Sequence, residues 1–129
     1  MNCGCARPRL GLDLADVGRV AAMVERFDDR ELGLVFAPGE RSAAGRARDP
    51  HWHYAVCLAA KEAVGKALGV GLAGFDWPDV EAVVEGRALR VRLAGRAALL
   101  AGRTRWTASF ACWDGLVLVQ VAGWPCAGS

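Results

Sequence analysis

The sequence has no long apolar run and no strong excess of charge of one sign. Nothing in it reaches the roughly 18 consecutive apolar residues of a membrane span, and its N-terminus lacks the apolar stretch of roughly 7–15 residues of a signal peptide. The 16 basic and 14 acidic residues leave a formal net charge of +2, so no global field indicates nucleic acid or a membrane as partner. We therefore expect a cytoplasmic protein with local electrostatic recognition.

Cysteine is present, but not in a pattern typical of disulfides. The five cysteines are odd in number and are not regularly spaced, which predicts reduced thiols. Cys3 and Cys5 could bind a metal ion, but no second pair lies near them in the sequence. An N-terminal tail is the simpler interpretation.

Length limits the chain to one domain. With 129 residues, 53% of them hydrophobic, it can form one modest core, which oligomerisation could supplement. We expect a flexible N-terminal tail over residues 1–9, a folded domain over residues 10–123 and a C-terminal tail over residues 124–129.

The first half of the sequence favours one strand and several helices. Residues 10–14 alternate in the manner of a short strand, and apolar residues then recur at spacings of three and four behind Asp16, which can cap a helix. Residues 36–40 indicate a turn that opens a short helix. Residues 51–68 lack proline and precede a group of glycines, which predicts one long helix.

The second half favours strands. Residues 80–84 and 89–93 indicate a hairpin, residues 96–100 a short helix, and residues 105–113 and 116–121 a second hairpin across Asp114-Gly115. The predicted fold is a single α+β domain with an antiparallel β-sheet and a long central helix.

Four charged residues are the candidates for chemistry. Asp13 ends the first predicted strand, where a buried carboxylate needs a partner. Glu62 and Lys66 have the spacing of an ordinary helix ion pair, which is a serious structural alternative. Lys61 lies within the apolar stripe of its helix, so its ammonium either extends to the edge of the core or binds an anion.

These residues form a coherent set for a pyrophosphate with Mg²⁺, an ion that prefers one or two carboxylates, phosphate oxygens and water. A lysine would neutralise the charge that develops on the leaving phosphate. Gly65, Gly69 and Gly71 could allow a phosphate to approach the backbone, or they could simply end the helix. These features alone do not name a reaction.

Three ordered motifs resemble those of the bacterial holo-acyl-carrier-protein synthases. They lie at residues 11–19, 36–40 and 60–69, and residues 86–95 resemble a fourth, weaker motif. The resemblance implies the 4'-phosphopantetheinyl transferase fold. It also implies transfer of the 4'-phosphopantetheine arm of coenzyme A to a serine of an apo acyl carrier protein, with release of 3',5'-ADP.

The same resemblance assigns the catalytic roles. Asp13 and Glu62 would hold Mg²⁺ with the coenzyme A pyrophosphate, Lys66 would contact phosphate near the reacting bond, and Glu62 or a metal-bound water would take the proton of the carrier serine. Further contacts to coenzyme A would come from the following residues: Lys61, Gly65, Gly69, Ser109 and Cys112.

The resemblance also implies the partners. Arg19 matches an arginine that faces the acidic recognition helix of the carrier, with Met23 and Phe27 as apolar neighbours. The family forms homotrimers with active sites between subunits, so Asp13 and Glu62 would come from adjacent chains. The carrier could serve fatty acid or polyketide biosynthesis.

The chain departs from the family pattern around the nucleotide. Cys57-Leu58 replaces the usual Arg-Phe, Ala88 a proline, and Cys112 a histidine. Residues that could substitute are Arg46, Arg48, His51 and His53. A degenerate homologue that binds coenzyme A or a carrier without turnover is therefore the alternative function.

Overall fold

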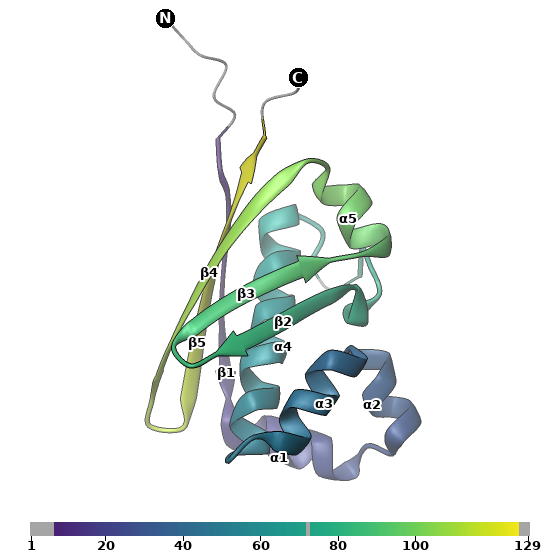
Figure 1. The fold of residues 1–129 in the computed structure, drawn as a ribbon, viewed down its shortest axis with the longest axis vertical. Helices are drawn as coiled ribbons and strands as arrows, with labels where there is room; N and C mark the ends of the chain where they lie inside the picture. The colour runs from purple at the N-terminus through teal and green to yellow at the C-terminus, as the bar shows by residue number, and fades with distance from the viewer. Residues whose placement is uncertain (1–6, 72, 127–129) are drawn as a thin grey trace, which may run out of the picture.

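A five-stranded antiparallel sheet and one long helix form the centre of the computed structural model, which describes residues 7–71 and 73–126 (Figure 1). The strand order is β1-β5-β4-β3-β2. The strands are β1 (Arg9–Asp16), β2 (Val80–Glu85), β3 (Ala88–Leu93), β4 (Thr104–Trp113) and β5 (Leu116–Pro125). The predicted α+β fold is thus confirmed.

Five α-helices and one short 3₁₀ helix accompany the sheet. They are α1 (Val17–Arg26), α2 (Asp29–Val35), α3 (Pro38–Arg46), α4 (Pro50–Leu68), the 3₁₀ helix η1 (Trp77–Asp79) and α5 (Gly95–Ala101). Helices α1 to α3 lie together beside one end of α4 (Figure 1). None of the helices in the described part of the chain is long and apolar enough to span a membrane.

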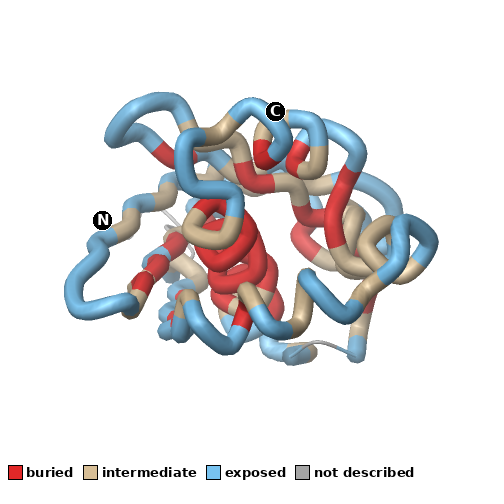
Figure 2. The backbone as a smooth tube through the Cα atoms, turned by 90° about the horizontal axis from the view of Figure 1, so that it is seen from below, coloured by how far each residue is buried: buried red, intermediate tan, exposed pale blue. Residues whose placement is uncertain are grey.

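Helix α4 confirms the predicted long helix and has clear start and stop signals. The Asp49 carboxylate accepts a hydrogen bond from the Trp52 N–H, 3.1 Å away, and Pro50 occupies the first turn. Gly69 ends the helix in the left-handed conformation, with φ of 76°. Twelve of the 19 residues of α4 are buried, and Figure 2 shows a helical run of buried backbone in the middle of the molecule.

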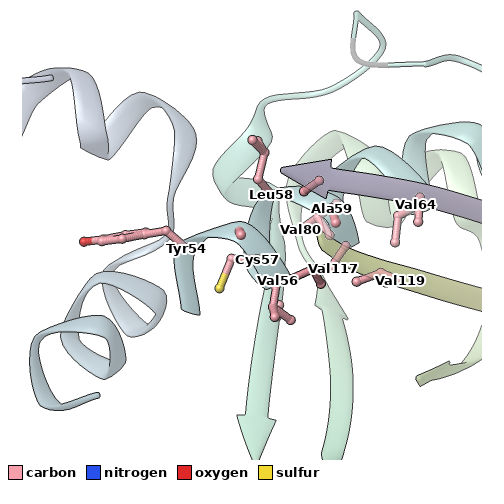
Figure 3. Packing of buried hydrophobic residues seen from close by; sticks show 14 of the residues in the cluster. Tyr54, Val56, Cys57, Leu58, Ala59, Val64, Val80, Val117 and Val119 are labelled. Atoms are coloured by element: carbon pink, nitrogen blue, oxygen red, sulfur yellow. The ribbon is translucent and has the colours of Figure 1, made fainter. Parts of the chain in front are cut away.

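The core lies between α4 and the inner face of the sheet. Val56 and Val64 of α4 pack among Val80 of β2 and Val117 and Val119 of β5 (Figure 3). The buried positions of β5 alternate with exposed ones, as a strand with one covered face requires. This packing fixes α4 against β5 and against the two edge strands, β1 and β2.

The two hairpins confirm the predicted turns. Asp114 and Gly115, between β4 and β5, have φ of 50° and 72°, which is the backbone that a two-residue hairpin turn needs. Gly86, between β2 and β3, has φ of 61°. Strands β3 and β4 share a single register pair, Leu89–Ala108, so the sheet divides into β1-β5-β4 and β3-β2.

Helix α2 was not predicted from the sequence. A capping box starts it: the Glu31 N–H donates to the Asp28 carboxylate at 2.8 Å, and the Asp28 N–H donates back to Glu31 at 3.0 Å. Helix α1 begins at the expected cap, where Asp16 accepts from the Arg19 N–H at 3.0 Å. The Cys3–Cys5 pair lies outside the described residues, as do residues 1–6 of the predicted N-terminal tail and residues 127–129 of the predicted C-terminal tail.

Candidate functional site

Asp13 lies on the inner face of β1, where it faces α4. Gly11, Asp13 and Ala15 are buried, whereas the residues between them are exposed. Asp13 is 8% exposed, and its Oδ1 accepts a hydrogen bond from the Lys66 ammonium at 2.7 Å. Its Oδ2 is buried without a hydrogen-bond partner. The carboxylate therefore has one oxygen paired with Lys66 and one buried oxygen without a donor.

A close backbone contact brings β1 against α4. A Cβ at Gly11 would lie 1.8 Å from the Ala63 carbonyl oxygen, so only glycine allows this approach. Asp13 follows two residues later on the same strand face, and Glu62 adjoins Ala63 on the helix. The contact thus explains how two distant segments bring their carboxylates together.

Glu62 and Asp13 form a carboxylate pair within one chain. Burial, a hydrogen bond shared with Asp13 and the charge of Asp13 raise the pKa of Glu62 to about 7, although Lys66 acts in the opposite direction. The expectation that adjacent chains supply Asp13 and Glu62 is therefore wrong. Strand β1 and helix α4 of the same chain pack directly on each other and present both groups.

Lys66 completes this cluster from the next turn of α4. Besides Asp13, its ammonium contacts the Leu12 carbonyl oxygen at 3.0 Å. Its side chain is 55% exposed, so it joins a buried carboxylate to the protein surface. The structural alternative was an ordinary helix ion pair between Glu62 and Lys66. The described residues do not form this pair, because Lys66 pairs with Asp13 instead.

The Asp13–Glu62 pair fits a divalent cation. The unpartnered Oδ2 of Asp13 and the adjacent Glu62 carboxyl offer hard oxygen ligands, as Mg²⁺ prefers. No cluster of three or more potential metal-ligating side chains occurs in the described part of the chain. The pair therefore suits an ion that takes its other ligands from a substrate and water, and it does not form a complete protein cage.

Lys61 corrects one sequence prediction. It was expected to contact coenzyme A, but its side chain is fully buried and its ammonium lies 2.5 Å from Glu40 Oε1. The ammonium also donates to the Val80 carbonyl oxygen. All of its interactions are internal, so Lys61 is not available to a ligand in solvent.

Glu40 is the buried partner that the sequence did not reveal. Its Oε1 also accepts from the Ala37 N–H at 2.8 Å, and its Oε2 accepts from the Ala82 N–H at 2.9 Å. The carboxylate thereby ties the start of α3, helix α4 and strand β2 to one point. The only sign in the sequence that Glu40 matters was its place in the motif at residues 36–40. That motif did not identify Glu40 as the partner of Lys61.

Two predicted ligand-binding glycines have structural roles here. A Cβ at Gly65 would lie 2.2 Å from the Gly71 carbonyl oxygen, so Gly65 is needed for the chain to fold back over the end of α4. Gly69 is the helix cap. Their positions support the capping alternative, and Gly65 is buried beneath the following loop.

Ser109 and Cys112 lie apart from the carboxylate pair. In the sheet register, Asp13 is level with Val119 and Phe110, and Ser109 points to the opposite face from Phe110. Cys112 is near the far end of β4, where its Sγ accepts a hydrogen bond from the Trp52 indole N–H at 3.0 Å. Within a single chain, therefore, neither Ser109 nor Cys112 lies near Asp13.

The residues that depart from the family pattern have distinct environments. Cys57 is fully buried, and burial raises the pKa of its thiol far above the ordinary value. His53 is 5% exposed, and burial lowers its pKa, although Glu40 opposes this shift. Neither side chain is available to a nucleotide in solvent.

The other proposed substitutes for the family's nucleotide-binding residues lie near the protein surface. His51 lies 3.5 Å from the Glu25 carboxylate, and Arg46 donates to the Ser42 hydroxyl at 2.7 Å. Arg48 is exposed. None of these interactions places a side chain at the Asp13–Glu62 pair.

The predicted carrier-binding residues share α1 and its C-terminal end. Arg19 is exposed, whereas Met23 is half-buried and packs against the core. Phe27 caps the helix, with its N–H bonded to the carbonyl oxygens of Met23 and Val24. Arg19 and Met23 lie four residues apart on one stripe of α1, and Phe27 follows at its C-terminal cap.

Comparisons with known proteins agree on one family. Residues 9–126 match the model of the 4'-phosphopantetheinyl transferase superfamily. A holo-[acyl-carrier-protein] synthase of Methylobacterium nodulans is 45% identical over 100 residues, which cover 74% of each chain. One from Xanthobacter autotrophicus is 48% identical over 75 residues, but the match covers only 57% of this chain and 56% of that protein.

The fold is also found in solved structures. The crystal structure of Helicobacter pylori holo-[acyl-carrier-protein] synthase in complex with coenzyme A superposes with a TM-score of 0.74 at 23% identity. The match covers 88% of this chain and 98% of that chain.

Proposed function

The chain belongs to the 4'-phosphopantetheinyl transferase superfamily, and from this premise we propose that it transfers the phosphopantetheine arm of coenzyme A to a serine of an acyl carrier protein. The single observation that carries the proposal is the cluster of Asp13, Glu62 and Lys66, which one strand and one helix assemble. Relatives named holo-[acyl-carrier-protein] synthase support the substrate class.

The reaction exchanges the phosphoanhydride bond of the coenzyme A pyrophosphate for a phosphodiester bond to the carrier serine. The serine oxygen of the carrier attacks the β-phosphorus of coenzyme A, and the bond to the leaving 3',5'-ADP breaks. Glu62 lies beside Asp13 and would accept the serine proton, and its pKa in the metal-free site is raised to about 7. Lys66 is suited to neutralise the phosphate charge, since its side chain is half exposed and extends toward Asp13.

A magnesium ion is part of the proposal, and Asp13 and Glu62 are the residues that would hold it. When bound, the ion supplies charge stabilisation to the pyrophosphate as it breaks. The buried, unpartnered Oδ2 of Asp13 supports this assignment, because a carboxylate oxygen without a donor is costly unless a ligand occupies it.

We also propose that the active protein is a homotrimer with sites between subunits. The outer face of β1 carries Leu10, Leu12 and Leu14, which are 67%, 51% and 52% exposed. Trp113 and Trp124, at opposite ends of the β4–β5 hairpin, are also exposed. An exposed apolar stripe of this kind is typical of an assembly surface. Assembly would also provide a route for Ser109 or Cys112 to reach the site of a neighbouring chain.

The carrier would dock on α1. Arg19 is exposed and has no ion pair among the described residues, so it is free to meet an acidic helix of the carrier. Met23 and Phe27 would provide the apolar part of that contact. This surface adjoins the catalytic cluster because α1 continues directly from β1, the strand of Asp13.

Binding without turnover is a second candidate, motivated by the replacements at Cys57 and Cys112. The retained cluster of Asp13, Glu62 and Lys66 favours the transferase. Calorimetry separates the two functions. Coenzyme A binding that is indifferent to Mg²⁺, with no 3',5'-ADP formed, would identify the binding protein.

The direct test is transfer itself. The purified protein is mixed with an apo carrier, coenzyme A and Mg²⁺, and the carrier is examined by intact-mass spectrometry. We expect the mass of one phosphopantetheinyl group on the carrier serine. No gain of mass with any carrier from the native genome would contradict the proposed function.

A further inference from the structure

We propose that Lys66 is an internal cation that hinders a divalent metal ion from binding Asp13 and Glu62 until coenzyme A supplies phosphate, so that metal and coenzyme A bind cooperatively. The inference rests on the proposed function, because it takes the coenzyme A pyrophosphate as the second partner of Lys66. It concerns the state of the site before the substrate arrives.

The contacts of Lys66 place its charge at the carboxylate proposed to hold the metal. The ammonium lies 2.7 Å from Asp13 Oδ1 and 3.0 Å from the Leu12 carbonyl oxygen. Lys66 is the only cation that pairs with the Asp13 carboxylate among the described residues, and the neighbouring Glu62 brings no positive charge. In the free protein, Lys66 therefore supplies the positive charge that a buried carboxylate needs.

The two partners differ in their freedom to move. Asp13 is 8% exposed and fixed in a paired strand, whereas the Lys66 side chain is 55% exposed. Lysine has a flexible four-carbon stem, so its ammonium can leave Asp13 without any change in the backbone. The site can thus exchange its cation while the carboxylates remain in place.

The chain has no other lysine that could take this role. Its two lysines are Lys61 and Lys66, and Lys61 is fully buried against Glu40. Among the described residues, no arginine forms an ion pair with Asp13 or Glu62. The charge that a metal ion meets at this pair is therefore that of Lys66.

Electrostatics then couples the two ligands. A divalent cation on Asp13 and Glu62 is repelled by the neighbouring ammonium, which weakens its affinity on the order of tenfold even at the dielectric constant of water. A pyrophosphate offers Lys66 another anion and offers the metal additional oxygen ligands. Each ligand then strengthens the binding of the other by the same factor, as linkage requires.

The test is a binding cycle with Mn²⁺, which uses the same oxygen ligands as Mg²⁺. Calorimetry measures Mn²⁺ affinity with and without coenzyme A for the wild type, Lys66→Met and the charge-retaining Lys66→Arg. Arg103→Met is the matched control, since it also removes one positive charge from an exposed position. Thermal unfolding confirms that each variant is folded.

We expect Lys66→Met to bind Mn²⁺ about tenfold more tightly than the wild type in the absence of coenzyme A. The factor by which coenzyme A strengthens Mn²⁺ binding should then be about tenfold smaller in this variant than in the wild type. Lys66→Arg and Arg103→Met should both have the wild-type affinity for Mn²⁺, with and without coenzyme A.

Unchanged Mn²⁺ affinity in Lys66→Met without coenzyme A, or equal coupling in both proteins, would overturn the inference. If the wild type still transferred the phosphopantetheine arm, the proposed function would stand and only the role of Lys66 in coupling would fall. A wild type that neither transfers the arm nor gains Mn²⁺ affinity from coenzyme A would instead refute the proposed function.

Discussion

Lys61 and Glu40 form an ion pair that is completely enclosed by the protein, with 2.5 Å between Nζ and Oε1. The pair joins α3 to α4 one residue before Glu62, and its remaining hydrogen bonds go to the backbone of β2 and of the turn before α3. It therefore fixes the helix that carries two of the three catalytic groups from the side opposite β1.

We expect Lys61→Met to lower the free energy of unfolding by about 3–5 kcal/mol, because it leaves the Glu40 carboxylate buried without its counter-charge. The double variant Lys61→Met/Glu40→Gln should lose less than the sum of the two single variants. Denaturant unfolding measures these differences.

The matched control is Arg90→Met, which removes one partner of the exposed Arg90–Glu85 pair. A surface pair of this kind contributes only about 0–1 kcal/mol. Equal losses for Lys61→Met and Arg90→Met would contradict the structural role of the buried pair.

Gly11→Ala tests the close contact between β1 and α4. A Cβ there meets the Ala63 carbonyl oxygen at 1.8 Å, so the strand must move away from the helix. We expect a loss of stability of about 1–3 kcal/mol, as for other overpacked sites, together with slower transfer because Asp13 moves with the strand.

Gly45→Ala is the control for this substitution, because a Cβ at Gly45 on α3 meets nothing within 4 Å. It should leave transfer unchanged and stabilise the helix by about 0.5–1 kcal/mol. A Gly11→Ala protein as stable and active as Gly45→Ala would show that the contact is not needed.

Glu62 should make stability depend on pH in the metal-free protein. Its pKa of about 7 in the folded state exceeds the ordinary 4.5, so the folded state holds a proton that the unfolded state has released between these values. Stability due to Glu62 therefore falls as pH rises from about 4.5 to 7. Asp13 and Lys66 are the charged groups that act on it.

The comparison is with Glu62→Gln, which retains the shape of the side chain but cannot ionise. With a chelator present, we expect the variant to be more stable than the wild type above pH 7 and to lose this advantage toward pH 5. Thermal unfolding at several pH values gives the difference. A constant difference from pH 5 to 8 would show that Glu62 titrates normally.

The sequence predicted those features that depend on neighbours along the chain. The caps at Asp16 and Gly69, the turn at Asp114-Gly115 and the extent of α4 all follow from local residue preferences, and the structure confirms them. Helix α2 was missed because it has only seven residues, none of them fully buried, and is too short to show an apolar stripe.

Features that depend on distant contacts were less predictable. Lys61 looked like an anion ligand because its partner Glu40 is 21 residues away on another helix. Asp13 and Glu62 were assigned to different chains because the resembled family has its active sites between subunits. No local pattern reveals that Gly11 lets β1 touch α4. The need of Asp13 for a partner was predictable from its position, but the identity of that partner, Lys66, was not.

Leu12→Lys tests the proposed assembly. Leu12 lies at the middle of the exposed apolar stripe of β1, so a charge there would be buried between subunits. We expect the wild type to sediment as a trimer and the variant as a monomer with a normal far-ultraviolet spectrum. Leu99→Lys, on the distant helix α5 at a position 82% exposed, should remain trimeric. A wild type that is monomeric at all concentrations would refute the trimer.

The most direct test of the central claim is the rate of transfer to the carrier serine by the wild type and by Asp13→Asn, followed by intact-mass spectrometry with saturating Mg²⁺. Asparagine keeps the size of the side chain but removes the charge that holds Lys66 and the metal. We predict complete conversion of the carrier by the wild type and a rate about 10²–10³-fold lower for the variant. Transfer by Asp13→Asn at the wild-type rate would contradict the assignment of Asp13, Glu62 and Lys66 as the catalytic centre.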